Sequence, residues 1–253
     1  MVQSQAILVP CEVWDMIGIC GYWFLTNYGA ALTSWALGQQ IKKFGYEVVF
    51  IDIPSWIFPT RLDYRDDNSP SRRFIKNNFD TTNRFENHRD LYELNKKCDC
   101  FLLGSDQMWN WRDGRYCEEG GFFLFDYVDN RKKIVSYATS FGESVFKGGE
   151  LDAALFERYL NRFDAISVRE RTGISIVNDI ARVSAEHVLD PVFLISQEEY
   201  RYLEKNSQMN ESLKDKYILA YLLQPTVDKI KIINEISAYY GLKWIALGDL
   251  DKQ

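Results

Sequence analysis

Residues 98–109 read Cys98-Asp99-Cys100-Phe101-Leu102-Leu103-Gly104-Ser105-Asp106-Gln107-Met108-Trp109. The first six residues form an almost uninterrupted apolar run, which is typical of a strand buried on both faces of a parallel sheet. Small and polar residues follow at once, where the strand ends. Ligands of open parallel sheets bind beyond the carboxyl ends of the strands. This stretch therefore predicts both the fold and the edge of the sheet at which a site is to be sought.

The rest of the chain repeats this alternation of apolar strands with segments of helical period, which predicts an α/β fold. We expect a Rossmann-like parallel sheet with helices on both faces over residues 1–195. A linker and the incomplete start of a second Rossmann-like domain are predicted over residues 196–253. The predicted strands are 16–20, 46–51, 98–103, 133–138, 165–168, 187–189, 217–223 and 243–247, and helices are expected from residue 30, between 70 and 97, and over 151–163 and 226–240.

The composition is that of a folded protein without a nucleic-acid partner. The 253 residues are 46% hydrophobic, and 30 lysines and arginines are scattered along a chain of net charge −6. No apolar run approaches the roughly 20 residues that span a bilayer, and the first ten residues lack the pattern of an export signal. Five cysteines without disulfide-scaffold spacing fit a reducing compartment. We therefore expect a cytoplasmic protein.

Signals for a metal or a nucleophile are weak. Cys98 and Cys100 alternate within a predicted strand, so burial explains them better than redox chemistry. His88 and His187 lie far apart without metal-ligand spacing. There is no Walker motif and no nucleophile elbow. We expect no bound metal and no cofactor.

Two polar clusters follow strands in the first half of the chain. Between the first strand and its helix, backbone N–H groups favour a carboxylate or phosphate, although an ordinary helix cap with a turn glycine explains the same residues. After the 98–103 strand, polar side chains beside tryptophan suit a sugar, and a carboxylate there suits proton transfer from a sugar hydroxyl. The alternative is a structural loop with core tryptophans. The candidates are Asn27, Tyr28 and Gly29 in the first cluster, and Gly104, Ser105, Asp106, Gln107 and Trp109 in the second.

Two further clusters follow the predicted strands at 133–138 and 165–168. Ser140 belongs to a run of hydroxyl-bearing and small residues that lines the same cleft or allows close helix packing. Arg169 and Glu170 come next, and an arginine at a strand end suits bidentate capture of an anion. A strand-end arginine paired with its neighbouring glutamate is the structural alternative. Asp190 is interpreted as structural.

Read together, these clusters resemble the polysaccharide pyruvyl transferase family over residues 14–195. The most specific segment is Asp99 to Trp109. Four further segments follow the family's order, and five motifs in order make a specific resemblance. They are Asn27-Tyr28-Gly29-Ala30 with Phe44-Gly45-Tyr46-Glu47-Val48 and Ile51-Asp52, Ser136-Tyr137-Ala138-Thr139-Ser140-Phe141-Gly142, Ala165-Ile166-Ser167-Val168-Arg169-Glu170, and Val188-Leu189-Asp190-Pro191.

The resemblance implies two facing Rossmann-like halves and transfer of pyruvate from phosphoenolpyruvate onto two hydroxyls of a sugar. The product is a cyclic ketal on a cell-surface polysaccharide. The expected partners are a sugar or polysaccharide-precursor acceptor and, by peripheral association, membrane-bound lipid-linked glycans. The implied roles are catalytic for Asp106 and Arg169, with Arg169 as an anion clamp. A nucleotide-sugar-dependent glycosyltransferase and a non-catalytic sugar-binding module remain the alternatives.

The family also carries a basic, histidine-containing segment in its C-terminal half, which this chain lacks, so a truncated or partial chain is expected. We therefore predict that the 253-residue chain alone does not turn over phosphoenolpyruvate. After Asp190 there is no histidine to serve as an acid near neutral pH. Phosphate release from phosphoenolpyruvate with candidate acceptor sugars, measured beside a longer homologue, tests this. Turnover near the homologue's rate would contradict it.

Overall fold

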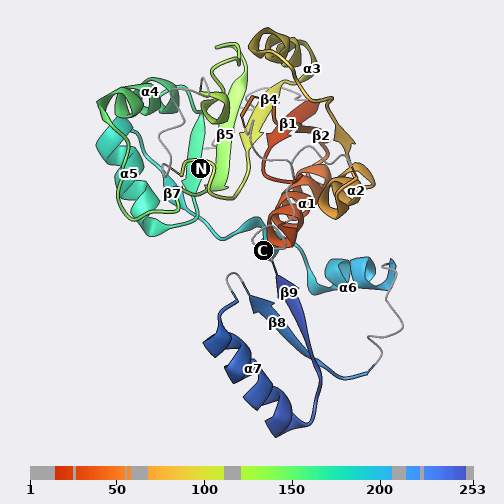
Figure 1. Cartoon of the computed structure of the whole chain (residues 1–253). Coiled ribbons are helices and arrows are strands. Elements are labelled where there is room, and N and C mark those ends of the chain that lie inside the picture. The colour runs from red at the N-terminus through yellow and green to blue at the C-terminus, as the bar shows by residue number, and fades with distance from the viewer. Residues whose placement is uncertain are drawn as a thin grey trace, which may run out of the picture.

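A seven-stranded parallel sheet forms the centre of the computed structural model, which describes residues 15–24, 27–54, 56–57, 68–110, 121–206, 215–222 and 225–248 (Figure 1). Its strands lie in the order β3-β2-β1-β4-β5-β6-β7, and each neighbouring pair is parallel. The strands are β1 (Met16–Cys20), β2 (Glu47–Ile51), β3 (Asp80–Thr81), β4 (Cys100–Leu103), β5 (Lys133–Thr139), β6 (Ala165–Val168) and β7 (Glu186–His187).

The strand order reverses direction between β1 and β4. Because crossovers between parallel strands are right-handed, helices that follow β1 and β2 cover one face, and those that follow β5 and β6 cover the other. The reversal creates the crevice in which open sheets of this kind bind ligands. The helices are α1 (Tyr28–Lys43), α2 (Pro70–Lys76), α3 (Leu94–Lys97), α4 (Glu150–Leu160), α5 (Arg171–Ala181) and α6 (Gln197–Asn206), with 3-10 turns η2 (His88–Glu93), η3 (Phe122–Leu124) and η4 (Pro191–Leu194).

The predicted α/β fold is confirmed, with one difference in detail. β1 and β6 have the predicted bounds, and Gly45 takes the left-handed conformation (φ 93°) expected after α1. The helical segments predicted between 70 and 97 are present as α2, η2 and α3, but the prediction omitted β3, a two-residue strand beside β2. So short a strand has no apolar periodicity that a sequence pattern could reveal. Most of the segment between β2 and α2 lies outside the described residues.

The core contains many aromatic side chains, and Trp23, Phe101 and Tyr127 among them are fully buried. All four residues of β4 are buried, as the opening sequence pattern predicts. On the side of the sheet that carries α1, a groove of about 820 Å³ is lined by residues of α1, β1, β4, β5 and β6, among them Leu37, Leu102, Val135 and Tyr137. The face of the sheet beside α1 is therefore only partly covered within the described residues. None of the described helices is both long and apolar enough to cross a membrane.

The described chain continues into a separate two-stranded parallel sheet. It consists of β8 (Ile218–Leu222) and β9 (Trp244–Gly248), joined by α7 (Val227–Tyr240) (Figure 1). No residue of α7 is buried. This strand–helix–strand unit matches the predicted elements at 217–223, 226–240 and 243–247. That it begins a second Rossmann-like domain stays a prediction.

A buried ion pair fixes the loop after β1. Arg72 on α2 is fully buried, and its Nη1 and Nη2 donate to both carboxylate oxygens of Asp52 at 2.7 and 3.1 Å. The guanidinium carbon also lies 5.1 Å from the ring centroid of Trp23 and 5.3 Å from that of Phe24. Planar, bidentate geometry of this kind is specific to arginine. The pair therefore ties α2 and the end of β2 to the loop that leads into α1.

We expect Arg72→Ala to lower the free energy of unfolding by about 3–5 kcal/mol, because it leaves the Asp52 carboxylate buried without its cation. Urea denaturation monitored by circular dichroism measures the loss. Arg73→Ala, an exposed arginine on the same helix, is the control and should change stability by less than about 0.5 kcal/mol. Equal effects of the two substitutions would show that the buried pair is not what fixes this region.

Candidate functional site

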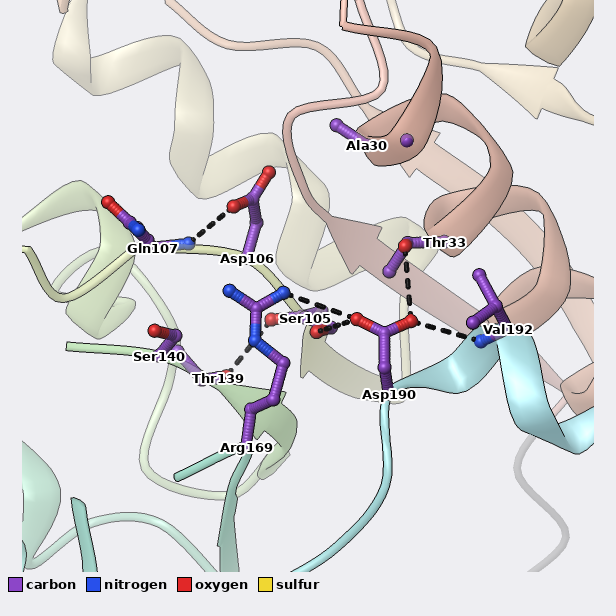
Figure 2. Close-up of polar contacts among 12 residues, drawn as sticks. Ala30, Thr33, Ser105, Asp106, Gln107, Thr139, Ser140, Arg169, Asp190 and Val192 are labelled. Carbon is purple, nitrogen blue, oxygen red and sulfur yellow. Dashed lines mark hydrogen bonds and ion pairs between the residues drawn. The ribbon is translucent and has the colours of Figure 1, made fainter. Parts of the chain in front are cut away.

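The carboxylate of Asp190 lies at the centre of a polar cluster at the carboxyl edge of the sheet (Figure 2). Its Oδ1 accepts hydrogen bonds from Thr33 Oγ1 at 3.2 Å and from the backbone N–H of Val192 at 3.1 Å. Its Oδ2 accepts from Ser105 Oγ and from Arg169 Nη1, each at 3.2 Å. One carboxylate thus joins α1, the loop after β4, the end of β6 and the start of η4.

Arg169 is held at this edge by acidic groups on two sides. Besides the bond to Asp190, its Nε lies 3.8 Å from Glu170 Oε1, and its side chain keeps 30% of its accessible surface. Its backbone carbonyl lies 3.1 Å from Nε2 of His187. The ion pair with Glu170, which was the structural alternative for Arg169, is thus present, but it is longer than the contact with Asp190. Within the described part of the chain, Nη2 has no partner and is available to an anion.

Asp106 follows β4 in a strained conformation. Its φ of 132° is unusual for a residue with a side chain, and on the neighbouring strand Ala138 also has a positive φ, of 54°. A bridge between Asp106 and Thr139 joins the two strand ends, and the Asp106 carbonyl accepts from the N–H of Ser140 at 2.9 Å. Strain of this kind persists where the surrounding structure enforces it, and it gathers at functional sites.

Burial raises the pKa of the Asp106 carboxyl. The nearby carboxylates of Asp190 and Glu170 act in the same direction. The backbone N–H of Gln107, which donates to Oδ1 at 2.8 Å, and the charge of Arg169 oppose the rise. A carboxylate with a raised pKa is a stronger base, which suits it to accept a proton from a hydroxyl.

The predicted hydroxyl Ser140 lies in the same region. It is fully buried, and its Oγ donates to Glu170 Oε1. Two residues later, Gly142 has a φ of 66°, and a Cβ atom there would lie 2.6 Å from Asn110 Nδ2 and 2.7 Å from Gln107 Cδ. The glycine therefore allows the loop after β5 to pack directly against the loop after β4.

The first predicted cluster lies at the start of α1. Asn27 Oδ1 accepts from the backbone N–H groups of Gly29 at 2.9 Å and Ala30 at 3.3 Å, so Asn27 caps the helix. Tyr28 keeps 45% of its surface exposed. Figure 2 places Ala30 and Thr33 of this helix beside the space between Asp106, Arg169 and Asp190. Helix capping, the alternative to ligand binding, accounts for the contacts of Asn27. The start of α1 lies beside the polar cluster around Asp190.

Two predicted residues of the 104–109 loop lie in the core. Trp109 has no exposed surface, and its indole Nε1 donates to the carbonyl of Phe123 at 3.3 Å. Its ring packs on Phe141, with centroids 5.3 Å apart. Gly104 is also buried, and its N–H donates to the carbonyl of Cys20 at 2.8 Å. The structure therefore makes Trp109 a core residue that no sugar can stack on. Trp111 lies outside the described residues.

The interpretation of Asp190 as structural agrees with its four hydrogen bonds, but the sequence did not reveal that it also contacts the candidate residues Ser105 and Arg169. It follows β7 and precedes Pro191, a position interpreted above as a structural end of the sheet. Its partner Thr33 lies in the second turn of α1 and was not considered. One signal in the sequence could have placed Asp190 at this edge of the sheet. Asp190 follows β7, the strand beside β6, and ligands of parallel sheets bind beyond the carboxyl ends of the strands. In the described part of the chain, no group of three His, Cys, Asp or Glu side chains could hold a metal ion.

Comparison with known protein families shows to which family the chain belongs. The family model of the polysaccharide pyruvyl transferases matches residues 27–252, which include the whole polar cluster. The chain belongs to the polysaccharide pyruvyl transferase family. This is a transferase family of polysaccharide biosynthesis, and it implies a sugar or polysaccharide acceptor. Among curated proteins, none matches the sequence.

We expect Asp106→Asn to stabilise the protein at pH 7 but not at acidic pH. A carboxyl whose pKa is raised on folding destabilises the folded state when it ionises, so stability falls as the pH rises from its ordinary value of 3.8 through the folded value. Asparagine tolerates positive φ and keeps the Oδ1 acceptor. Melting temperatures of variant and parent at pH 3.5 and pH 7 test this.

The control for this experiment is Asp129→Asn. The hydrogen bonds from Arg131 lower the pKa of the exposed Asp129 carboxyl to about 2, so its removal should bring no stabilisation at pH 7. A melting difference for Asp106→Asn that is the same at both pH values would show that ionisation of Asp106 does not matter to stability.

Proposed function

We propose that this chain takes part in transfer of a pyruvyl group from phosphoenolpyruvate to two hydroxyls of a sugar, in the cytoplasmic synthesis of a cell-envelope polysaccharide. The observation that carries the proposal is a cation, Arg169, near a partly buried carboxylate of raised pKa, Asp106, at the carboxyl edge of the sheet. The proposed reaction needs no cofactor, because the donor is itself an activated enol ester.

Arg169 is proposed to bind the carboxylate or phosphate of phosphoenolpyruvate. The hydrogen bond that Nη1 donates to Asp190 orients the guanidinium and leaves other N–H groups directed away from that carboxylate. A guanidinium forms paired hydrogen bonds with planar carboxylates and with phosphates. Glu170 Oε1 lies 3.8 Å from Nε, so the guanidinium is held between two carboxylates. Arg169 is thus oriented before the donor arrives, which lowers the entropic cost of binding.

Asp106 is proposed to accept a proton from an attacking sugar hydroxyl. In the overall reaction a proton adds to the methylene carbon of phosphoenolpyruvate, and phosphate leaves from the adjacent carbon. Two hydroxyl oxygens bond to that carbon and lose their protons. A base of raised pKa in a partly buried position assists the loss of one of these protons. The loop residues Ser105 and Gln107 are proposed to help to orient the acceptor, together with the start of α1.

Saturation-transfer NMR separates this function from the alternatives. Phosphoenolpyruvate and a panel of nucleotide-sugars are each added to the chain, alone and with candidate acceptor sugars. Signal transfer to phosphoenolpyruvate supports the proposal. Transfer to a nucleotide-sugar in its place would favour a glycosyltransferase, and transfer to glycans alone would favour a sugar-binding module.

We expect Arg169→Ala to weaken phosphoenolpyruvate binding about ten- to hundredfold, because one charge-assisted hydrogen bond is worth roughly 1.5–3 kcal/mol. Isothermal titration measures the affinity. Arg171→Ala removes an exposed arginine two residues away and should leave the affinity unchanged. An Arg169→Ala variant that folds normally and binds phosphoenolpyruvate as tightly as the parent would remove Arg169 from the site.

A further inference from the structure

A second polar cavity lies at the opposite edge of the sheet from the cluster around Asp190. It has a volume of about 440 Å³ and is lined by Asp126, Val128, Asn130, Lys132, Ile134, Arg158, Tyr159 and Arg162. Lys132 directly precedes β5, whereas the predicted site follows the other end of that strand. Seven residues of strand separate the two ends by roughly 20 Å. The cavity is therefore separate from the site proposed above.

The charges that line this cavity favour an anion. Three cations, Lys132, Arg158 and Arg162, face one carboxylate, Asp126. That carboxylate is engaged by His88, whose Nε2 lies 3.0 Å from Oδ2. Three positive charges less one negative charge leave a local excess of two, in a chain whose net charge is −6. The positive charge is thus local to the cavity and opposite in sign to the net charge of the chain.

Two guanidiniums are fixed around one aromatic ring. The guanidinium carbons of Arg158 and Arg162 each lie 5.5 Å from the ring centroid of Tyr159. Arg162 is anchored further, because its Nη1 donates to the carbonyl of Phe125 at 3.2 Å and its Nη2 to that of Val128. Arg162 therefore contributes a fixed positive potential. Arg158, on α4, remains able to form new hydrogen bonds.

The other two cations keep donors for a ligand. Within the described residues, Arg158 forms no ion pair with a carboxylate, and the contact from Lys132 Nζ to Asp99 Oδ1 is long, at 3.4 Å. Asn130 adds an amide to the lining. Arginine and lysine beside each other, with an amide donor, form the donor set that proteins use for phosphate. Three cations are too few for the extended contact that a nucleic acid makes.

We infer that this cavity binds a phosphate group carried by a small anion or by a lipid headgroup, with Arg158 and Lys132 as its principal donors. The phosphate would replace water in front of the two side chains while Arg162 supplies charge from behind. This inference does not depend on the proposed function, because the cavity shares no residue with the cluster at the carboxyl edge.

The test uses the whole chain and two phosphate sources. Inorganic pyrophosphate is titrated by isothermal calorimetry at low salt, and vesicles of phosphatidylglycerol in phosphatidylcholine are tested by co-sedimentation. We expect Arg158→Ala and Lys132→Ala each to weaken binding about tenfold, which is the effect of losing one charge-assisted hydrogen bond. Binding of pyrophosphate alone identifies a soluble ligand, and binding of vesicles identifies a headgroup.

Two matched variants keep the outcome clear. Arg131→Ala removes a highly exposed cation next to Lys132 that pairs with Asp129 and does not line the cavity, so it should leave binding unchanged. Arg169→Ala removes the proposed anion binding at the carboxyl edge, so the pyrophosphate binding that persists in this variant belongs to the cavity. The inference fails if neither phosphate source binds, or if Arg131→Ala weakens binding as much as Arg158→Ala does.

Discussion

The Asp190 carboxylate accepts hydrogen bonds from α1, from the loop after β4 and from Arg169 after β6. These segments follow strands on both sides of the point at which the strand order reverses. No single crossover connection therefore determines their relative positions. A carboxylate with two oxygens and several lone pairs can satisfy all of them at once. The orientation of the arginine, the position of Ser105 and the contact of α1 with the segment after β7 all depend on it.

The sequence predicted the sheet well because its strands are buried on both faces. In a chain of this composition, the apolar run ending at Leu103 and the short run Ala165–Val168 are best explained as buried strands. The strand Asp80–Thr81 escaped detection because it is recognised only by its pairing with β2. Local periodicity carries no information about a pairing made at a distance.

The polar cluster at the carboxyl edge was predictable in place but not in detail. Parallel strands bring their carboxyl ends to one edge, and so Asp106 and Arg169 were both expected there. Whether the Trp109 ring faces ligand or core depends on how the next loop packs, and Phe123 and Phe141 enclose it. Asp190 looked structural because the sequence does not reveal that four donors converge on it. The same carboxylate is in fact both a structural link and a neighbour of the candidate catalytic groups.

The hydrogen bond between Thr33 and Asp190 closes a loop of 157 residues. Contacts so distant in sequence form late, because the entropy of the intervening chain must first be lost. During synthesis, the helix that carries Thr33 leaves the ribosome long before its partner is translated. Until then the loop after β4 lacks the acceptor for Ser105, and the cluster has no fixed arginine. The nascent sheet can therefore pair its first strands before the cluster around Asp190 is assembled. The cluster proposed to bind an anion is therefore completed in the last stage of folding of the central sheet.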